Sequence, residues 1–275
     1  MEEFKLACCQ MNVVDDKEKN IVHAIELVRK ASCNGAKLIT LPEMFNTPYD
    51  NAKFVENAEK EEDSPTLATM CSVAEDENVY LQAGSIAEYD DGKIYNTAYL
   101  IDDEGEIIAK HRKMHMFDID TDKMKFTESD TLSPGDTVTT VNTPFATISL
   151  AICYDIRFSE LWTLMNKNDS DIILLPGAFN RTTGPLHWET LIRARAIDNQ
   201  AFVVATSPSQ VENPYYVAWG HSMIVDAWGK VLANACEKEE ILYADISPES
   251  VRSVREQIPI LKNKRVDVYE TIYKK

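Results

Sequence analysis

Short apolar runs recur along the chain, and their lengths are typical of β-strands. Several are continuously apolar, which is expected for strands covered on both faces. The expected strands are residues 4–11, 37–41, 79–86, 96–101, 107–110, 146–153, 171–175, 201–207, 221–226, 230–234 and 241–246. Because the runs are spread over almost the whole sequence, they predict large sheets with a substantial core.

Between the strands, apolar residues repeat with the 3.6-residue period of amphipathic helices. In the first such stretch Ile21, Ala24, Ile25 and Val28 fall on one face, and Gly35 is suited to ending the helix. Ser64-Pro65 and Pro185 are expected to open two more helices, and Ser159 and Ser247-Pro248 are each expected to cap another. Strands and helices alternate first and strands then dominate, which predicts one layered α/β (α+β) domain spanning residues 1–275.

The composition narrows the range of partners. Lys and Arg number 28 and Asp and Glu number 45, a net charge of −17 that repels nucleic acid and anionic membranes. No apolar run approaches the length of a membrane span, and the first residues lack a secretory or transit pattern. The six cysteines contain no C-x-x-C pair. We therefore expect a cytoplasmic protein with reduced thiols and with no metal, cofactor, nucleic-acid or membrane partner.

Three ionisable residues stand at the ends of expected strands. Cys153 ends the apolar run 148–153, Glu43 follows the run that ends at residue 41, and Lys113 follows the strand 107–110. Polar residues at strand ends are held firmly and yet presented at a rim. A thiol is mostly protonated near neutral pH, so a cysteine nucleophile needs a base or a cation beside it. Glu43 and Lys113 could provide both for Cys153.

A histidine could also serve as the base, as in papain-like enzymes. The chain contains His23, His111, His115, His187 and His221. His23 lies within the first expected helix and His187 near the start of another, so neither has a strand-end position like that of Glu43. The longest stretch without a clear period is residues 115–136, and long irregular segments are often functional.

Several phrases, in this order, resemble the nitrilase, or carbon–nitrogen hydrolase, superfamily. They include LPEMFNTPY at 41–49, HRKMHMFDID at 111–120 and ICYDIRFSELW at 152–162. Further phrases at 126–136, 176–200, 215–232 and 252–269 extend the resemblance over nearly the whole chain. The phrases HMFDID, PGAFN-x-TTGP-x-HW and AWGHS look most like the omega-amidase branch of this superfamily.

The resemblance implies a four-layer α-β-β-α sandwich and a Glu–Lys–Cys catalytic triad. Glu43 would be the general base, Lys113 the cation and Cys153 the nucleophile, while Glu128 would orient the lysine and the substrate amide. The Lys113 ammonium and the backbone N–H of Tyr154 are candidate donors to the oxyanion that forms on the substrate.

Omega-amidases release ammonia from short dicarboxylic monoamides such as 2-oxoglutaramate and 2-oxosuccinamate, so the resemblance implies such a small-molecule substrate. Arg157, on the turn after the nucleophile, is placed to bind the distant carboxylate. Phe179 and Thr183 match the branch's acyl-pocket wall and carboxylate contact, and Tyr49 could close the pocket.

The resemblance also implies a homodimer that pairs through helices, including the helix after Cys153. We expect the C-terminal tail, from about residue 248 to 275, to contribute to that contact. Two alternatives remain open at this point. The protein could be an amidase for N-carbamoyl compounds or other aliphatic amides, or a nitrilase, with the same triad. It could instead be a catalytically silent scaffold.

Overall fold

Two six-stranded sheets form the centre of the protein. The computed structural model describes residues 3–121 and 124–274. In spatial order the first sheet contains β14 (Glu240–Ile246), β1 (Phe4–Gln10), β2 (Ala36–Thr40), β3 (Tyr80–Asp90), β4 (Lys93–Ile101) and β5 (Ile107–Arg112). The second contains β13 (Val231–Asn234), β12 (Met223–Val225), β11 (Phe202–Thr206), β10 (Ile172–Pro176), β9 (Thr147–Leu150) and β8 (Thr139–Asn142).

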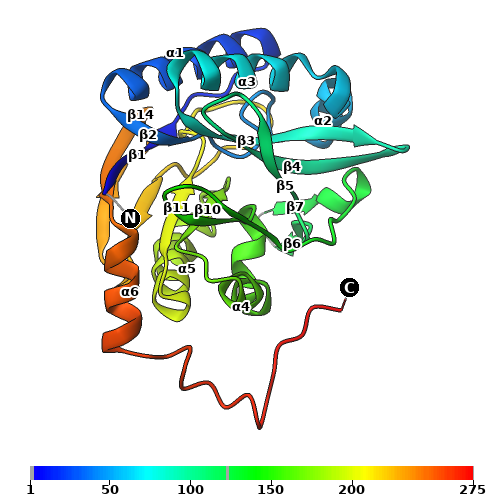
Figure 1. The fold of residues 1–275 in the computed structure, drawn as a ribbon. Helices are drawn as coiled ribbons and strands as arrows, with labels where there is room; N and C mark the ends of the chain where they lie inside the picture. The colour runs from blue at the N-terminus through cyan, green and yellow to red at the C-terminus, as the bar shows by residue number, and fades with distance from the viewer. Residues whose placement is uncertain (1–2, 122–123, 275) are drawn as a thin grey trace.

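Helices cover the outer face of each sheet, as Figure 1 shows. One group contains α1 (Lys17–Cys33) and α3 (Pro65–Glu77), and the other contains α4 (Ser159–Lys167) and α5 (Gly184–Asn199). The remaining helices are α2 (Asn51–Asn57), α6 (Pro248–Gln257) and the short 3₁₀ helices η1 (Glu61–Asp63), η2 (Glu128–Asp130) and η3 (Cys153–Arg157). The order helix, sheet, sheet, helix confirms the predicted four-layer α-β-β-α fold.

Alternate side chains of the central strands explain these layers. In β1, Leu6 and Cys8 belong to the core between the two sheets, whereas Ala7 and Cys9 belong to the core beneath α1 and α3. Successive side chains of a strand point to opposite faces, so a strand buried on both sides must be apolar throughout. The continuous apolar runs of the sequence are therefore the signature of this double burial.

Hydrogen bonds also join the two sheets near the carboxyl ends of β2 and β11. The hydroxyl oxygens of Thr40 and Thr206 lie 2.7 Å apart, and the Cys8 thiol lies 3.2 Å from the Thr206 hydroxyl. All three side chains are fully buried. These contacts hold the ends of strands from both sheets side by side, and the loops that follow them carry the candidate site.

The expected strands and helices all have counterparts, with differences at their ends. Strand β9 ends at Leu150, three residues earlier than the run 146–153 predicted. Ser64 caps α3 by accepting the backbone N–H of Leu67 at 3.0 Å, as expected. The expectation that Ser159 caps α4 was wrong, because Phe158 is the N-cap residue and no side chain bonds there. Ser247 is the N-cap residue of α6, as expected, but its side chain makes no capping hydrogen bond.

The periodicity did not predict β8, α2 or the small hairpin of β6 (Asp118–Thr121) and β7 (Met124–Thr127). Within the irregular stretch 115–136 the chain thus forms this hairpin and then η2. Beyond α6 the described chain runs to residue 274 without a further helix or strand (Figure 1). Among the helices of the described residues, none is both long enough and apolar enough to cross a bilayer.

Candidate active site

Cys153 is the first residue of η3 and lies on the strained turn that follows β9. After β9 ends, the N–H of Ala151 still donates to the Leu174 carbonyl at 3.0 Å, and η3 then begins at Cys153 itself. Cys153 has a φ of +46°, in the left-handed region that costs a non-glycine residue about 1–3 kcal/mol. A Cβ added to Gly177 would lie 3.3 Å from the Cys153 Cα. The turn is therefore packed closely and holds the thiol in one place.

Glu43 reaches the same place from the first sheet. It lies three residues beyond β2 and is only 1% exposed. Its Oε2 accepts the backbone N–H of Ala178 at 2.8 Å, and its Oε1 accepts a hydrogen bond from the Asn96 side chain at 2.9 Å. Glu43 also raises the pKa of the Cys153 thiol, so the two side chains lie close enough to interact. The carboxylate is thus fixed from two sides and faces the sulfur.

Lys113 is the cation of this buried cluster, which we define as Glu43, Tyr49, Lys113, Glu128 and Cys153. Its Nζ lies 2.8 and 2.9 Å from the two carboxylate oxygens of Glu128 and 3.1 Å from Glu43 Oε1. Nζ also donates to the Tyr49 hydroxyl at 3.1 Å, and that hydroxyl donates to Glu128 at 2.8 Å. Lys113 and Glu128 are fully buried, so each charge depends on the other.

Burial and charge set the protonation of the cluster. Burial raises the pKa of the Cys153 thiol well above its ordinary value, Glu43 adds to this effect, and the Lys113 charge opposes it. Burial likewise raises the pKa of Glu43, again against the Lys113 charge. Burial disfavours the Lys113 ammonium, but Glu128 and Glu43 outweigh it and raise the Lys113 pKa. A protonated thiol therefore faces a carboxylate that is a stronger base than an exposed one, beside a permanent cation.

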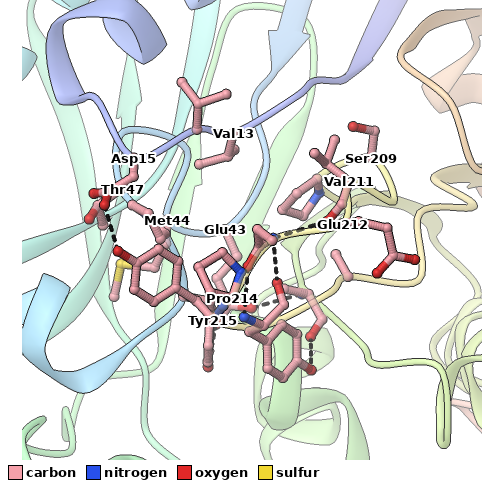
Figure 2. Close-up of a pocket in the computed structure, with 18 residues that line it drawn as sticks. Val13, Asp15, Glu43, Met44, Thr47, Ser209, Val211, Glu212, Pro214 and Tyr215 are labelled. Atoms are coloured by element: carbon pink, nitrogen blue, oxygen red, sulfur yellow. Dashed lines mark hydrogen bonds between the residues drawn. The ribbon is translucent and has the colours of Figure 1, made fainter.

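A cavity of about 300 Å³ adjoins the cluster (Figure 2). Residues of the segment 43–49, among them Glu43 and Tyr49, line one part of it, and Ala178, residues 13–15 and residues in 208–218 line the rest. The Tyr216 hydroxyl donates to the carbonyl of Ala178 at 2.6 Å, next to the amide that binds Glu43. The Tyr215 hydroxyl donates to Asp15 at 2.5 Å, which ties the two sides of the cavity together, as seen in Figure 2.

The other candidate substrate residues do not line this cavity. The Arg157 guanidinium lies over the rings of Phe179 and Tyr154, with its carbon 5.0 and 5.5 Å from their centres. Its Nη1 lies 3.3 Å from His187 Nδ1. Thr183 precedes α5, and its hydroxyl donates to Asn180 at 3.1 Å. The structure therefore places Arg157 with Phe179, while Tyr49 belongs to the buried cluster and Thr183 is bonded within its own turn.

Three residues at the site were not predicted from the sequence. Asn96 binds Glu43 from within β4, Tyr216 binds the Ala178 carbonyl, and Asp155 binds the turn that carries Cys153. A polar residue within an apolar strand was the only signal for Asn96. Asp155 was visible as an acid in the turn after the nucleophile, but its partners come from distant parts of the chain.

The histidine alternative is not supported by the geometry. His111 and His115 both contact Asp155, His23 contacts Glu239, and His187 contacts Arg157. None of these contacts involves Cys153. The ionisable groups that act on the pKa of the Cys153 thiol include the Glu43 carboxylate and the Lys113 ammonium.

Comparison with known proteins agrees with this geometry. The model of the family described as Carbon-nitrogen hydrolase matches residues 5–256. The chain belongs to the carbon–nitrogen hydrolase family. It is therefore a hydrolase of carbon–nitrogen bonds, and the predicted superfamily is confirmed.

Relatives of this carbon–nitrogen hydrolase include omega-amidases of the same length. The chain is 47% identical to Omega-amidase NIT2 of Mus musculus and 45% identical to that of Homo sapiens, in both cases over 276 aligned residues and the full length of both chains. Among solved structures, Saccharomyces cerevisiae Nit3, a member of branch 10 of the nitrilase superfamily, is 38% identical. The match covers 96% of this chain and 97% of Nit3, with a TM-score of 0.89. The resemblance to the omega-amidase branch is confirmed by these relatives.

Proposed function

We propose that the protein is an omega-amidase, which hydrolyses the terminal amide of short dicarboxylic monoamides such as 2-oxoglutaramate and 2-oxosuccinamate to a dicarboxylate and ammonia. The observation that carries the proposal is the buried cluster, in which Lys113 Nζ lies within 3.1 Å of both Glu43 and Glu128 beside the Cys153 thiol. Full-length similarity to omega-amidases supports this choice among amidases.

The first half of the reaction makes a thioester. Glu43 accepts the thiol proton as the Cys153 sulfur attacks the amide carbonyl carbon, and the carbonyl oxygen becomes an oxyanion. The Lys113 ammonium and the Tyr154 N–H are the proposed donors to that oxyanion, and one such donor contributes about 2.7–4 kcal/mol. Glu43 then gives its proton to the amide nitrogen, the carbon–nitrogen bond breaks, and ammonia leaves.

The second half of the reaction releases the acid. Glu43, again a carboxylate, accepts a proton from water as the water oxygen attacks the thioester carbon. The carbon–sulfur bond breaks, and the sulfur takes the proton from Glu43. Glu128 and Tyr49 hold Lys113 throughout, because their oxygens lie 2.8–3.1 Å from its Nζ. This proposed chemistry requires no cofactor or metal.

Recognition of the second carboxylate is assigned to Arg157. Its Nη1 lies beside His187, but its buried Nε has no hydrogen-bond partner among the described residues. A guanidinium with an unused donor is suited to a carboxylate that arrives with the substrate. Phe179, under the guanidinium, is proposed as the wall for the acyl chain, with Thr183 as a further polar contact.

A panel of substrates tests the function and Arg157 together. We expect the wild-type protein to release ammonia rapidly from 2-oxoglutaramate and slowly from neutral aliphatic amides, N-carbamoyl compounds and nitriles. In Arg157→Ala, kcat/KM for the monoamide should fall about 10–100-fold, because a charged hydrogen bond contributes about 1.5–3 kcal/mol. Activity on a neutral amide should change little. Ammonia release measured across the panel gives both results.

Arg193→Ala is the matched control, because Arg193 lies on α5 and binds Glu189 and the Gly229 carbonyl. It should leave the whole panel unchanged. Equal losses on charged and neutral amides in Arg157→Ala would remove Arg157 from carboxylate binding. A preference for a nitrile or an N-carbamoyl compound would favour another enzyme of the same family. No ammonia from any substrate would favour the silent scaffold.

We also propose that two copies pair as a homodimer to which the C-terminal tail contributes. Val266, Val268, Tyr269 and Ile272 are between 63% and 68% exposed, which is unusual for apolar side chains gathered in one segment. Lys167 on α4 binds Glu270 at 2.7 Å, so the tail lies beside the helix that follows the nucleophile.

The cytoplasmic location remains a proposal, supported by the six free cysteines.

Light scattering tests the dimer. The full chain should have twice the monomer mass, and truncation after Gln257 should shift it toward the monomer because the exposed apolar segment is removed. A variant that changes Val266 and Ile272 to serine checks the same surface without shortening the chain. A monomeric full chain, or a dimer that is equally stable in both variants, would contradict the role of the tail.

A further inference from the structure

Asp155 is a fully buried carboxylate that the proposed reaction does not use. It is the third residue of η3 and follows Cys153 by two positions. Its Oδ2 accepts the backbone N–H of Ile152 at 3.0 Å, which closes the turn directly before the nucleophile. Its own carbonyl accepts the indole N–H of Trp162 at 3.0 Å, which ties the turn to α4.

The same carboxylate also binds the segment that carries Lys113. His111 and His115 flank Lys113 by two residues on either side. Asp155 Oδ1 accepts the backbone N–H of His115 at 3.1 Å and lies 2.7 Å from its Nδ1, while Oδ2 lies 3.2 Å from Nε2 of His111. The Asp155 carboxylate therefore joins the Cys153 turn, which follows β9 of the second sheet, to the end of β5 in the first sheet.

The contact between His111 and Asp155 is part of a longer chain of hydrogen bonds. The Thr139 hydroxyl donates to the carbonyl of Lys110 at 3.1 Å, so its oxygen is an acceptor toward Nδ1 of His111, 3.1 Å away. The ring nitrogens of His111 thus lie opposite two oxygen atoms that can accept hydrogen bonds, one of Thr139 and one of Asp155. Burial alone would raise the pKa of Asp155, but the bonds from His111 and His115 outweigh it and lower that pKa. Asp155 is therefore a carboxylate anion that accepts hydrogen bonds from both sides of the junction.

We propose that Asp155 is a positioning residue, whose carboxylate clamps the Cys153 turn to the Lys113 segment and so sets the distance between the sulfur, the base and the cation. The inference rests on the proposed function. The structure supports it because Cys153 holds a strained φ of +46°, which persists only when its surroundings fix it. The two segments come from different sheets, and Asp155 is bonded to both.

The test is Asp155→Asn, which keeps the shape of the side chain. An amide group has only one acceptor oxygen, so its NH₂ must face two of the donors that the carboxylate now accepts. We expect kcat per reactive thiol to fall by about 100-fold, because small misplacements of reacting groups have effects of this size. The KM for 2-oxoglutaramate should change by less than about threefold, since the clamp does not touch the bound substrate.

A second readout does not need the substrate. Alkylation of Cys153 by iodoacetamide, followed by peptide mass mapping, should slow by about tenfold or more in Asp155→Asn, because the thiol no longer meets its base. This separates the two proposals. If the wild-type protein releases no ammonia, the proposed function fails, whereas the change in thiol reactivity still reports on the clamp.

Two further variants keep the test decisive. His115→Phe removes one donor and keeps an aromatic ring stacked on Phe158, whose ring centre lies 3.6 Å from that of His115. We therefore expect this variant to fold even if Asp155→Asn does not. It should lower kcat and alkylation in the same direction by a smaller factor. Asp171→Asn is the control, because this buried aspartate accepts the Thr147 N–H at 3.0 Å away from the cluster.

The clamp is overturned if kcat per reactive thiol and the alkylation rate in both Asp155→Asn and His115→Phe stay within about threefold of the wild type. It is equally overturned if Asp171→Asn lowers them as much, or if all lost activity tracks the unfolded fraction seen by circular dichroism. In those cases Asp155 stabilises the fold and does not position the nucleophile.

Discussion

Replacement of Cys153 by alanine should abolish ammonia release and leave the protein folded. The sulfur is the only group proposed to form a covalent bond with the substrate, so kcat should fall by on the order of 10⁴-fold or more. The turn should persist, because a φ of +46° costs alanine about as much strain as it costs cysteine. The smaller alanine side chain also fits in the space that the cysteine side chain occupies. Ammonia release and circular dichroism measure the two effects.

Mass spectrometry after an acid quench provides the complementary observation. The wild-type protein mixed with 2-oxoglutaramate should carry an acyl adduct on Cys153, and Cys153→Ala should carry none. Cys236→Ala is the matched control, because Cys236 is an exposed free cysteine. It should retain both the adduct and full activity. Turnover that survives in Cys153→Ala would refute the thioester mechanism.

Replacement of Lys113 by methionine should remove activity and also destabilise the fold. Glu43 and Glu128 would then share a buried site without the ammonium that now lies within 3.1 Å of both. Breaking a buried ion pair by removing one partner typically costs about 3–5 kcal/mol. Urea unfolding followed by circular dichroism should show a loss of this size. Activity should be lost because the proposed oxyanion donor is absent.

A double variant separates the two consequences. Lys113→Met combined with Glu128→Gln leaves Glu43 as the one carboxylate and restores the wild-type net charge of these three positions, so most of the lost stability should return while activity does not. Lys125→Met serves as the control, because Lys125 is 72% exposed and, within the described part of the chain, its ion pair is with Asp120. A single Lys113→Met variant as stable as this control would contradict the electrostatic account of the cluster.

The sequence predicted the positions of strands and helices best where their side chains are completely buried. In β1, apolar residues on both faces pack into two cores, so the pattern is unambiguous. Strand β8 is only partly buried, and its sequence TTVN has no apolar alternation, so periodicity could not detect it. Ser159 looked like a cap, but η3 runs up to the start of α4 and leaves no open turn for a capping hydroxyl.

The candidate site was predicted in part for a similar reason. Glu43, Lys113 and Cys153 each follow an apolar run, and strand ends can be read from the chain. Glu128 follows no such run and was indicated only by resemblance to the family. Asn96 and Asp155 act through partners 53 and 40 residues away in the chain, and such pairs depend on how the two sheets pack.

The buried cluster also bears on how this protein could be engineered. Folding must strip water from an ammonium and two carboxylates that lie entirely inside the molecule. Proteins in which well-packed apolar residues replace such buried ions are often as stable as the original protein, or more stable. Selection for thermostability alone would therefore favour variants that replace the buried charged residues and lose activity. A screen for thermostable variants has to measure turnover as well as melting temperature.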